Sequence, residues 1–183
     1  MRSSSPAEQS QRWFAFLRAI NVGKRRVAMD RLASIFHDLD FDRVETFIAS
    51  GNVVFETSMK DEAKLVRRIE SALDAALGFR SDTFLRTREQ LADVAATRPF
   101  PNQDAVVYVG FLADEPSSAA SKAIAGLSND VDQFAVVGRE IWWLARNGMG
   151  RSTMSGAKLE KTLGMPTTFR GLHTLERLLA KYP

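Results

Sequence analysis

Cysteine is absent from this chain of 183 residues, which excludes disulfide bonds, thiolate metal sites and a cysteine nucleophile. Because that absence fits a reducing compartment, we expect a cytoplasmic protein. No apolar run approaches the length of a membrane span, so the sequence gives no reason to expect a membrane partner. Residues 1–11 are polar and lack the apolar stretch of a signal peptide, and we expect them to form a disordered tail.

Residues suited to acid–base or metal chemistry are scarce. His37 and His173 are the only histidines, and neither has a metal-ligating neighbour at helical spacing. Asp38, Asp40 and Asp42 alternate, but the glycine and the distal glutamate of a calcium loop are missing. The strand-turn-helix motif GxSxG is absent as well. We therefore assign no metal site and no catalytic residue, leave the cofactor unknown, and leave open whether the protein is an enzyme.

Neither sign of charge dominates. The 25 Lys and Arg residues are interleaved with 22 Asp and Glu residues, which gives a net charge of +3 and an isoelectric point near 9.4. This mildly basic balance allows an anionic partner without requiring one.

Apolar periodicity predicts the same order of elements twice: strand, helix, strand, strand, helix, strand, helix. That is the order of the split βαβ, or ferredoxin-like, unit followed by one helix. We therefore predict an α+β fold with two pseudo-duplicated ferredoxin-like lobes and mainly antiparallel sheets. Arg-Pro-Phe-Pro at residues 98–101 ends a helix and places the boundary between lobes of residues 12–100 and 101–183. The predicted strands are residues 13–21, 44–49, 53–57, 82–86, 106–112, 133–137, 141–145 and 167–170.

Several stretches resemble a known family. They are Leu-Arg-Ala-Ile-Asn-Val-Gly at residues 17–23, Thr-Phe-Ile-Ala-Ser-Gly-Asn-Val-Val-Phe at 46–55, Gly-Arg-Ser at 150–152 and Leu-Glu-Lys-Thr-Leu-Gly at 159–164. From Phe14 onward the chain resembles DUF1697, a bacterial family of unknown function. Members usually carry Arg-Asn-Trp-Asn-Thr near the end, where this chain has Arg-Gly-Leu-His-Thr. The resemblance implies no substrate, cofactor or catalytic residue.

Arg18 is the first candidate for a functional residue. The predicted strand places it on an apolar face, where a guanidinium needs a partner. One interpretation is an internal ion pair with an acid such as Glu45 or Glu56. The other is an anion-binding fork at the strand end, shared with Asn21 and the amides around Gly23.

Two neighbouring features belong to the same hypothesis. Lys24 and the two arginines after it are either a solvated basic loop or a source of attraction for phosphates. Gly51 and Asn52 fit the centre of a tight type II′ turn. Ser50 and Asn52 either build that turn or face the loop that carries Arg18.

In the second half of the chain, Pro116 fits the first turn of a predicted helix.

A second candidate site precedes a helix in the second half. Gly150, Arg151 and Ser152 suit a loop whose amides point at an oxyanion, although the spacing of a P-loop is absent. The alternative is that Ser152 or Thr153 simply caps the helix. Arg170 follows that helix and would complete an anion site.

Three functions remain open at this point. The first is a cytosolic module that binds a small phosphate- or carboxylate-bearing ligand. The second is nucleic-acid binding, because ferredoxin-like sheets can present aromatics such as Phe14, Phe16 and Phe55 for base stacking. The third is protein interaction or self-association through sheet edges or the hairpin of Trp142 and Trp143, in which one indole would lie in the core and the other at an interface or the surface. The sequence does not set the oligomeric state.

Overall fold

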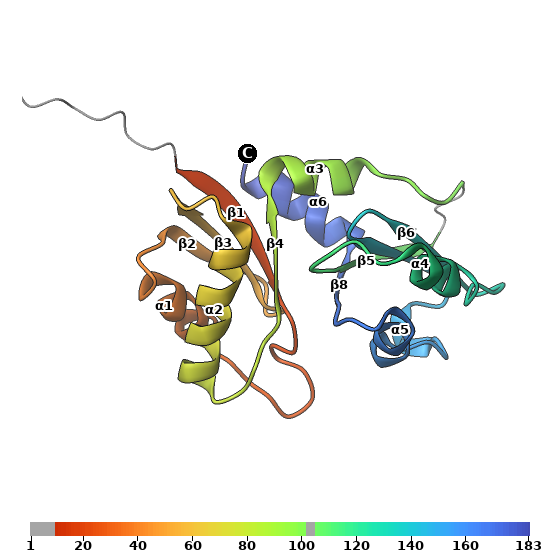
Figure 1. Cartoon of the computed structure of the whole chain (residues 1–183), viewed down its shortest axis with the longest axis horizontal. Coiled ribbons are helices and arrows are strands. Elements are labelled where there is room, and N and C mark those ends of the chain that lie inside the picture. Colours follow the sequence, from red (N-terminus) through yellow and green to blue (C-terminus); the bar gives the residue numbers. More distant parts are fainter. Residues whose placement is uncertain (1–9, 102–104) are drawn as a thin grey trace, which may run out of the picture. The chain divides into compact units, whose positions relative to one another are not determined.

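The computed structural model describes residues 10–101 and 105–183, and inter-residue contacts divide the chain into the units Met1–Arg88 and Glu89–Pro183 (Figure 1). We call these the first unit and the second unit. The first unit contains β1 (Gln11–Leu17), α1 (Met29–His37), β2 (Asp42–Phe47), β3 (Asn52–Thr57), α2 (Glu62–Leu77) and β4 (Thr83–Thr87). Helix α3 (Arg88–Ala96) begins at the division, and the second unit continues with β5 (Val106–Phe111), α4 (Ser118–Ala125), β6 (Asp132–Val137), β7 (Glu140–Ala145), the 3₁₀-helix η1 (Met149–Arg151), α5 (Gly156–Leu163), β8 (Thr168–Gly171) and α6 (Leu172–Lys181).

Both units build the same sheet. The strand orders are β2-β3-β1-β4 and β6-β7-β5-β8, and every pairing is antiparallel. Helices α1 and α2 follow the first and third strands of one unit, as α4 and α5 do in the other. This is the split βαβ topology. The predicted α+β fold with two pseudo-duplicated lobes is confirmed.

Two glutamates repeat one structural device in both units. Glu70 of α2 accepts the N–H of Thr83, at the start of β4, with an O–N distance of 2.9 Å. Glu160 of α5 accepts the N–H of Thr167, just before β8, also at 2.9 Å. Each bond satisfies a backbone donor where the chain enters the last strand of its sheet, so the duplication extends to side-chain contacts.

Strand β1 carries apolar side chains on both faces. Trp13, Ala15 and Leu17 belong to the apolar cluster formed with α1 and α2, whereas Phe14 and Phe16 project from the opposite face because side chains alternate along a strand. The three residues of the cluster are at most 3% exposed. The two helices contribute their apolar stripes to the cluster through Leu32, Ile35, Phe36, Leu65, Ile69 and Leu73.

The core of the second unit surrounds Trp143. Its ring lies 5.3 Å from Phe134 and 5.8 Å from Phe169, measured between centroids, beside apolar residues of α4 and α5. Helix α6 contacts β5 and β8 and buries Leu172, Leu175 and Leu178. Trp142 projects from the other face of β7, so one indole lies in this core and the other does not, and the position of Trp142 at an interface or the surface stays a prediction.

The boundaries of the predicted first strand need correction. Gln11, the last residue of the predicted tail, already begins β1, and residues 1–9 lie outside the described residues. The strand ends at Leu17 and not at residue 21, because Ala19 and Asn21 have φ of 62° and 55°, which a pleated strand does not accommodate.

Contacts group Glu89 and later residues with the second unit. The predicted lobes of residues 12–100 and 101–183 remain a prediction.

The turn between β2 and β3 is longer than predicted. Residues 48–51 form the connection, and Phe47 pairs directly with Asn52, so Asn52 is the first residue of β3 and not the centre of a two-residue turn. Its buried side chain donates to the carbonyl of Phe47 at 3.0 Å and to Oγ of Ser50 at 2.9 Å. These bonds hold the longer loop closed. Gly51 keeps its predicted positive φ, at 76°.

The connections of the second unit agree better with the sequence. Gly138 and Arg139 form the predicted two-residue turn between β6 and β7. Pro116, however, precedes α4 and is not in its first turn, because the N-cap is Ser117, whose hydroxyl accepts the N–H of Ala120.

Gly51 permits the closest approach in the first unit and provides a test of this fold. A Cβ at Gly51 would lie 2.9 Å from Cβ of Ile20 and 3.2 Å from the carbonyl oxygen of Leu17, whereas a Cβ at Gly23 would meet nothing within 4 Å. We expect Gly51→Ala to lower the free energy of unfolding by about 2–4 kcal/mol, from overpacking and left-handed strain together. Gly23→Ala, at a similar positive φ, should show only the strain of about 1–2 kcal/mol. Equal losses in urea denaturation would contradict the packing argument.

Candidate functional site

Three connections of the first unit meet at one end of its sheet. Leu17 at the end of β1 pairs with Thr83 at the start of β4, and Phe47 at the end of β2 pairs with Asn52 at the start of β3. Figure 1 shows the segments after β1 and before β4 leaving the sheet at the same end. We call residues 18–28, 48–51 and 78–82 the three-loop end. It contains five of the candidate ligand-binding residues from the sequence analysis. Four lie in the β1–α1 segment and one in the hairpin: Arg18, Asn21, Gly23, Lys24 and Ser50.

Asn21 ties two of these loops together. Its Nδ2 donates to the carbonyls of Ala49, at 3.0 Å, and Val27, at 3.2 Å, and its Oδ1 accepts the N–H of Val27 at 2.7 Å. Because all three bonds are made to backbone atoms, the Asn21 side chain fixes the path of residues 21–27. Asn21 is therefore a positioning residue for this end.

Arg18 connects to the third loop. Its NH1 lies 3.3 Å from Oδ2 of Asp82, and its backbone N–H donates to the carbonyl of Asp82 at 2.9 Å. The hydroxyl of Ser81 donates to the carbonyl of Arg18 at 2.7 Å. Arg80 also contacts Asp82, at 3.4 Å. Asp82 is thus an acid partner of Arg18, where the interpretation of an internal pair had named Glu45 or Glu56, and Glu56 pairs with Arg12 at 2.8 Å.

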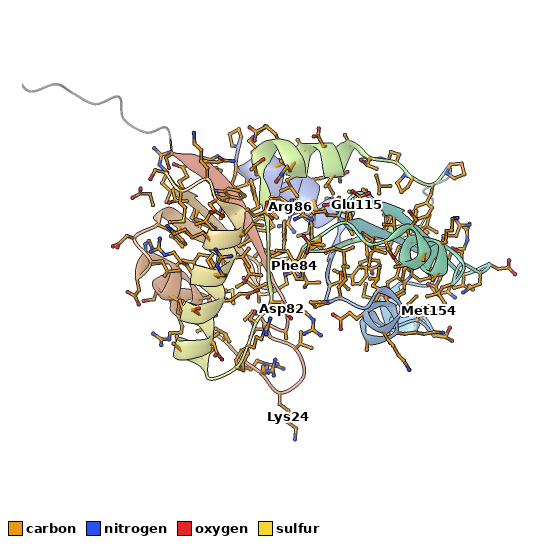
Figure 2. All side chains as sticks on the ribbon, in the orientation of Figure 1. Lys24, Asp82, Phe84, Arg86, Glu115 and Met154 are labelled. Carbon is orange, nitrogen blue, oxygen red and sulfur yellow. The ribbon has the colours of Figure 1, made fainter. Side chains whose placement is uncertain are left out.

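The basic segment after Gly23 is held in part by its own loop. The Arg25 guanidinium lies 4.3 Å from the centroid of Phe79. NH1 of Arg26 donates to the carbonyls of Gly23 and Arg25, at 2.9 and 2.7 Å. Lys24 is exposed, and no carboxylate of the described chain pairs with it. Figure 2 shows Lys24 pointing away from the ribbon at the tip of the loop.

The backbone of the β1–α1 segment is strained in a regular way. Ala19, Asn21 and Gly23 have φ of 62°, 55° and 62°, and they alternate with Ile20 and Val22, whose φ is not positive. Left-handed conformations are unfavourable for residues other than glycine. Alternation of left-handed and right-handed residues turns successive N–H groups toward one side in anion-binding nests, and the alternating sign of φ here is one part of that geometry. Over the described residues, no protein acceptor bonds the N–H groups of residues 19–24.

The equivalent end of the second unit differs in length and in charge. There the connections are residues 112–117, 138–139 and 164–167, shorter after the first strand and in the hairpin than 18–28 and 48–51. They carry Asp114, Glu115 and Arg139, whereas the three-loop end carries five cationic side chains and one carboxylate. The fold is therefore completed in the second unit without a long, strained and basic segment.

Ser152 of the second candidate site is bonded inside the second unit. Its hydroxyl donates to Oδ2 of Asp132 at 2.6 Å and accepts the N–H of Met154 at 2.9 Å, while Oδ1 of Asp132 accepts the indole N–H of Trp143 at 2.7 Å. Asp132 is 2% exposed. The N-cap of α5 is Ser155, not Ser152 or Thr153 as the alternative interpretation expected. Ser152 thus anchors its loop to the sheet.

Arg170 does not join Gly150, Arg151 and Ser152. Phe169 packs with Trp143 on one face of the sheet, so the next residue, Arg170, projects from the opposite face. Its NH1 donates to Oγ1 of Thr168 and to the carbonyl of Phe169, at 2.9 and 2.8 Å. Burial lowers the pKa of Arg170 to about 10, which leaves it cationic at neutral pH. Gly150 and Arg151 are exposed.

Sequence reasoning missed Arg80, Asp82 and Asp132. The first two lie between a helix that ends at Gly78 and a strand that is the antiparallel neighbour of β1. Topology therefore offered a signal, because antiparallel neighbours bring the start of one strand to the end of the other. Within the described ranges there is no group of three His, Asp or Glu that could hold a metal ion, and no helix is long and apolar enough to cross a membrane.

The Ser152 anchor makes a prediction for stability. Ser152→Ala leaves Oδ2 of buried Asp132 without its hydroxyl donor and the N–H of Met154 without its acceptor. We expect the free energy of unfolding to fall by about 1–3 kcal/mol in urea denaturation. Thr153→Ala, at the exposed neighbouring position, is the matched control and should stay within about 0.5 kcal/mol of wild type. A neutral Ser152→Ala would show that the loop is not anchored in this way.

Glu70 makes a prediction for pH dependence. Burial raises its pKa above 4.5, the N–H of Thr83 lowers it, Asp82 raises it, and Arg80 lowers it, in that order of size. Because the folded pKa is the higher one, ionisation opposes folding, and stability falls as pH rises from the unfolded value through the folded one. Glu70→Gln keeps an acceptor for Thr83 and removes the charge. The Tm of Glu70→Gln minus the Tm of wild type should therefore be larger at pH 7 than below pH 4.5. A Tm difference that does not change with pH would contradict this prediction.

Comparisons with known proteins agree with this architecture. The solved structure of the conserved bacterial protein SP0830 from Streptococcus pneumoniae is similar over 94% of this chain and 98% of that chain, with a TM-score of 0.71 and 22% sequence identity. At this identity the likeness concerns the fold. No curated protein matches the chain. The family model of DUF1697, a protein of unknown function, matches residues 11–142, and the chain therefore belongs to the DUF1697 family.

Proposed function

We propose that the protein binds a small anionic ligand, bearing a phosphate or a carboxylate, at the three-loop end of its first unit. The absence of cysteine supports the further proposal that it does so in the bacterial cytosol. The proposal concerns binding and includes no chemical step.

The observation that carries the proposal is the alternating left-handed backbone at Ala19, Asn21 and Gly23. Strain of this kind persists only where surrounding contacts hold it, and it concentrates at binding sites. The three backbone bonds of the Asn21 side chain supply such contacts. The second unit closes the same topology with a shorter segment, so the fold itself does not demand this conformation.

Charge supports the same conclusion. Lys24 is exposed beside N–H groups that have no acceptor within the described protein. Arg18 and Arg80 hold the one carboxylate of this end, Asp82, at 3.3 and 3.4 Å. The N-terminus of α1, which begins after Ala28, adds the positive end of the helix dipole, and the carboxylate of Asp30 in the first turn partly offsets it. An anion placed against this segment meets donors and cations together.

One of the aromatic residues that suggested nucleic-acid binding argues against that alternative. Phe55 belongs to the apolar cluster under α1 and α2, and its ring lies 4.5 Å from that of Phe41 and 5.5 Å from that of Phe36, measured between centroids. Base stacking requires an accessible ring face. Phe55 therefore offers no stacking platform, and we propose the small anion in preference.

The test is a thermal-shift and calorimetric titration with inorganic phosphate and succinate. A ligand at a hundred times its dissociation constant adds about 2.7 kcal/mol, which for a chain of this size is a rise of roughly 5–10 °C in Tm. We expect one of the two anions to give this shift. Lys24→Gln, which removes a tip charge without removing a bond to the described protein, should weaken binding about fivefold to tenfold.

Two further variants sharpen the result. Lys122→Gln, at an exposed lysine of α4 in the second unit, is the matched control and should bind like wild type. Asn21→Ala should weaken binding because it releases the loop, although Asn21 need not touch the anion. Equal loss of affinity in Lys24→Gln and Lys122→Gln, or no shift with either anion, would contradict the proposal.

A further inference from the structure

The exposed large hydrophobic residues of the first unit lie at the three-loop end. Among its described residues they are Val22, with 63% of its surface exposed, and Ile48, with 43%. They come from two connections that are bonded to each other, since Asn21, next to Val22, donates to the carbonyl of Ala49, next to Ile48. Single exposed aliphatic residues need no explanation. Two exposed aliphatic residues on adjacent loops that also carry several cations require one.

The backbone at Ile48 adds to this observation. Its φ is 50°, a left-handed conformation that is a genuine outlier for a β-branched residue. The hairpin could relieve this strain with glycine, asparagine or aspartate at the same position. An exposed isoleucine is kept there instead.

Cations lie close in sequence to one of these aliphatic side chains. Lys24 and Arg25 follow Val22 after Gly23 and are exposed. Arg25 reaches across to Phe79 of the third loop, which Arg80 follows. The guanidinium of Arg25 covers the Phe79 ring at 4.3 Å, so this end offers aliphatic contact and positive charge but no bare aromatic face.

We propose that the three-loop end docks on the surface of an anionic lipid bilayer, and this inference rests on the anion site proposed above, with the lipid phosphate as the anion. Peripheral binding of this kind combines shallow insertion of apolar side chains with attraction of Lys and Arg to anionic headgroups. A single-stranded nucleic acid would need aromatic side chains with accessible faces on which its bases could stack. Because this end offers aliphatic side chains and no bare aromatic face, lipid is the favoured partner. The lack of a membrane-crossing helix among the described residues concerns spanning and not surface contact.

The test is co-sedimentation of the full chain with vesicles. Phosphatidylcholine vesicles are compared with vesicles that also contain phosphatidylglycerol, at low and moderate salt. We expect binding only to the anionic vesicles, weakened by salt because the charges are exposed. Lys24→Gln should lower the partition coefficient about fivefold, the effect of one cation near such a surface.

A pair of single variants separates the apolar contribution from charge. Ile48→Asn keeps every cation and lies outside residues 19–24, and asparagine tolerates the left-handed φ. It should bind anionic vesicles about fivefold more weakly, while inorganic phosphate still raises its Tm as in wild type. Val137→Asn, which changes a similarly exposed aliphatic residue of the second unit, is the matched control and should bind vesicles like wild type.

The outcomes distinguish the two proposals. A phosphate shift without vesicle binding, or vesicle binding that Ile48→Asn leaves unchanged, overturns the docking proposal and leaves the anion site intact. Binding of a single-stranded oligonucleotide that is stronger than vesicle binding and equally unaffected by that variant also overturns it. Vesicle binding without a shift by inorganic phosphate would contradict a site for the free anion and would support docking in which the phosphate of the lipid is the anion.

Discussion

Burial of one face of β1 under α1 and α2 is the constraint on which the first unit depends. Trp13, Ala15 and Leu17 lie in the apolar cluster that the two helices cover. The strand is also paired to β3 and β4 along most of its length. The loops that can carry a binding site therefore begin where the strand ends, and Arg18 is the first residue beyond that end.

The duplication allows the contribution of the fold to be separated from features of one unit. Sheet order, helix placement and the glutamate that bonds the entry to the last strand are common to both units. The connections of the three-loop end differ from the equivalent connections of the second unit in length, charge and backbone conformation. Features that one copy of a fold can omit are not needed for folding, which is why the three-loop end carries the functional proposals.

Much of the fold was predictable because its signals are local. Apolar alternation and helical periodicity placed each strand and helix of the two units, and Gly78 and Gly164 marked the ends of α2 and α5 in the left-handed conformation. The errors occurred where a distant contact decides the backbone. The first strand was predicted too long because a left-handed Ala19 has no sequence signal, and the hairpin turn was predicted too short because the bonds of Asn52 close a longer loop.

The sequence by itself determined the α+β class, the duplicated order of elements and the absence of thiol chemistry. Periodicity and composition depend on neighbouring residues and need no knowledge of distant ones. Only the tertiary structure decided that Asp82 pairs with Arg18, that Asn21 bonds the hairpin, and that Arg170 lies on the other face of the sheet from Ser152. These are contacts between residues far apart in the chain, and they follow from which strands pair and in what register, which no local pattern specifies.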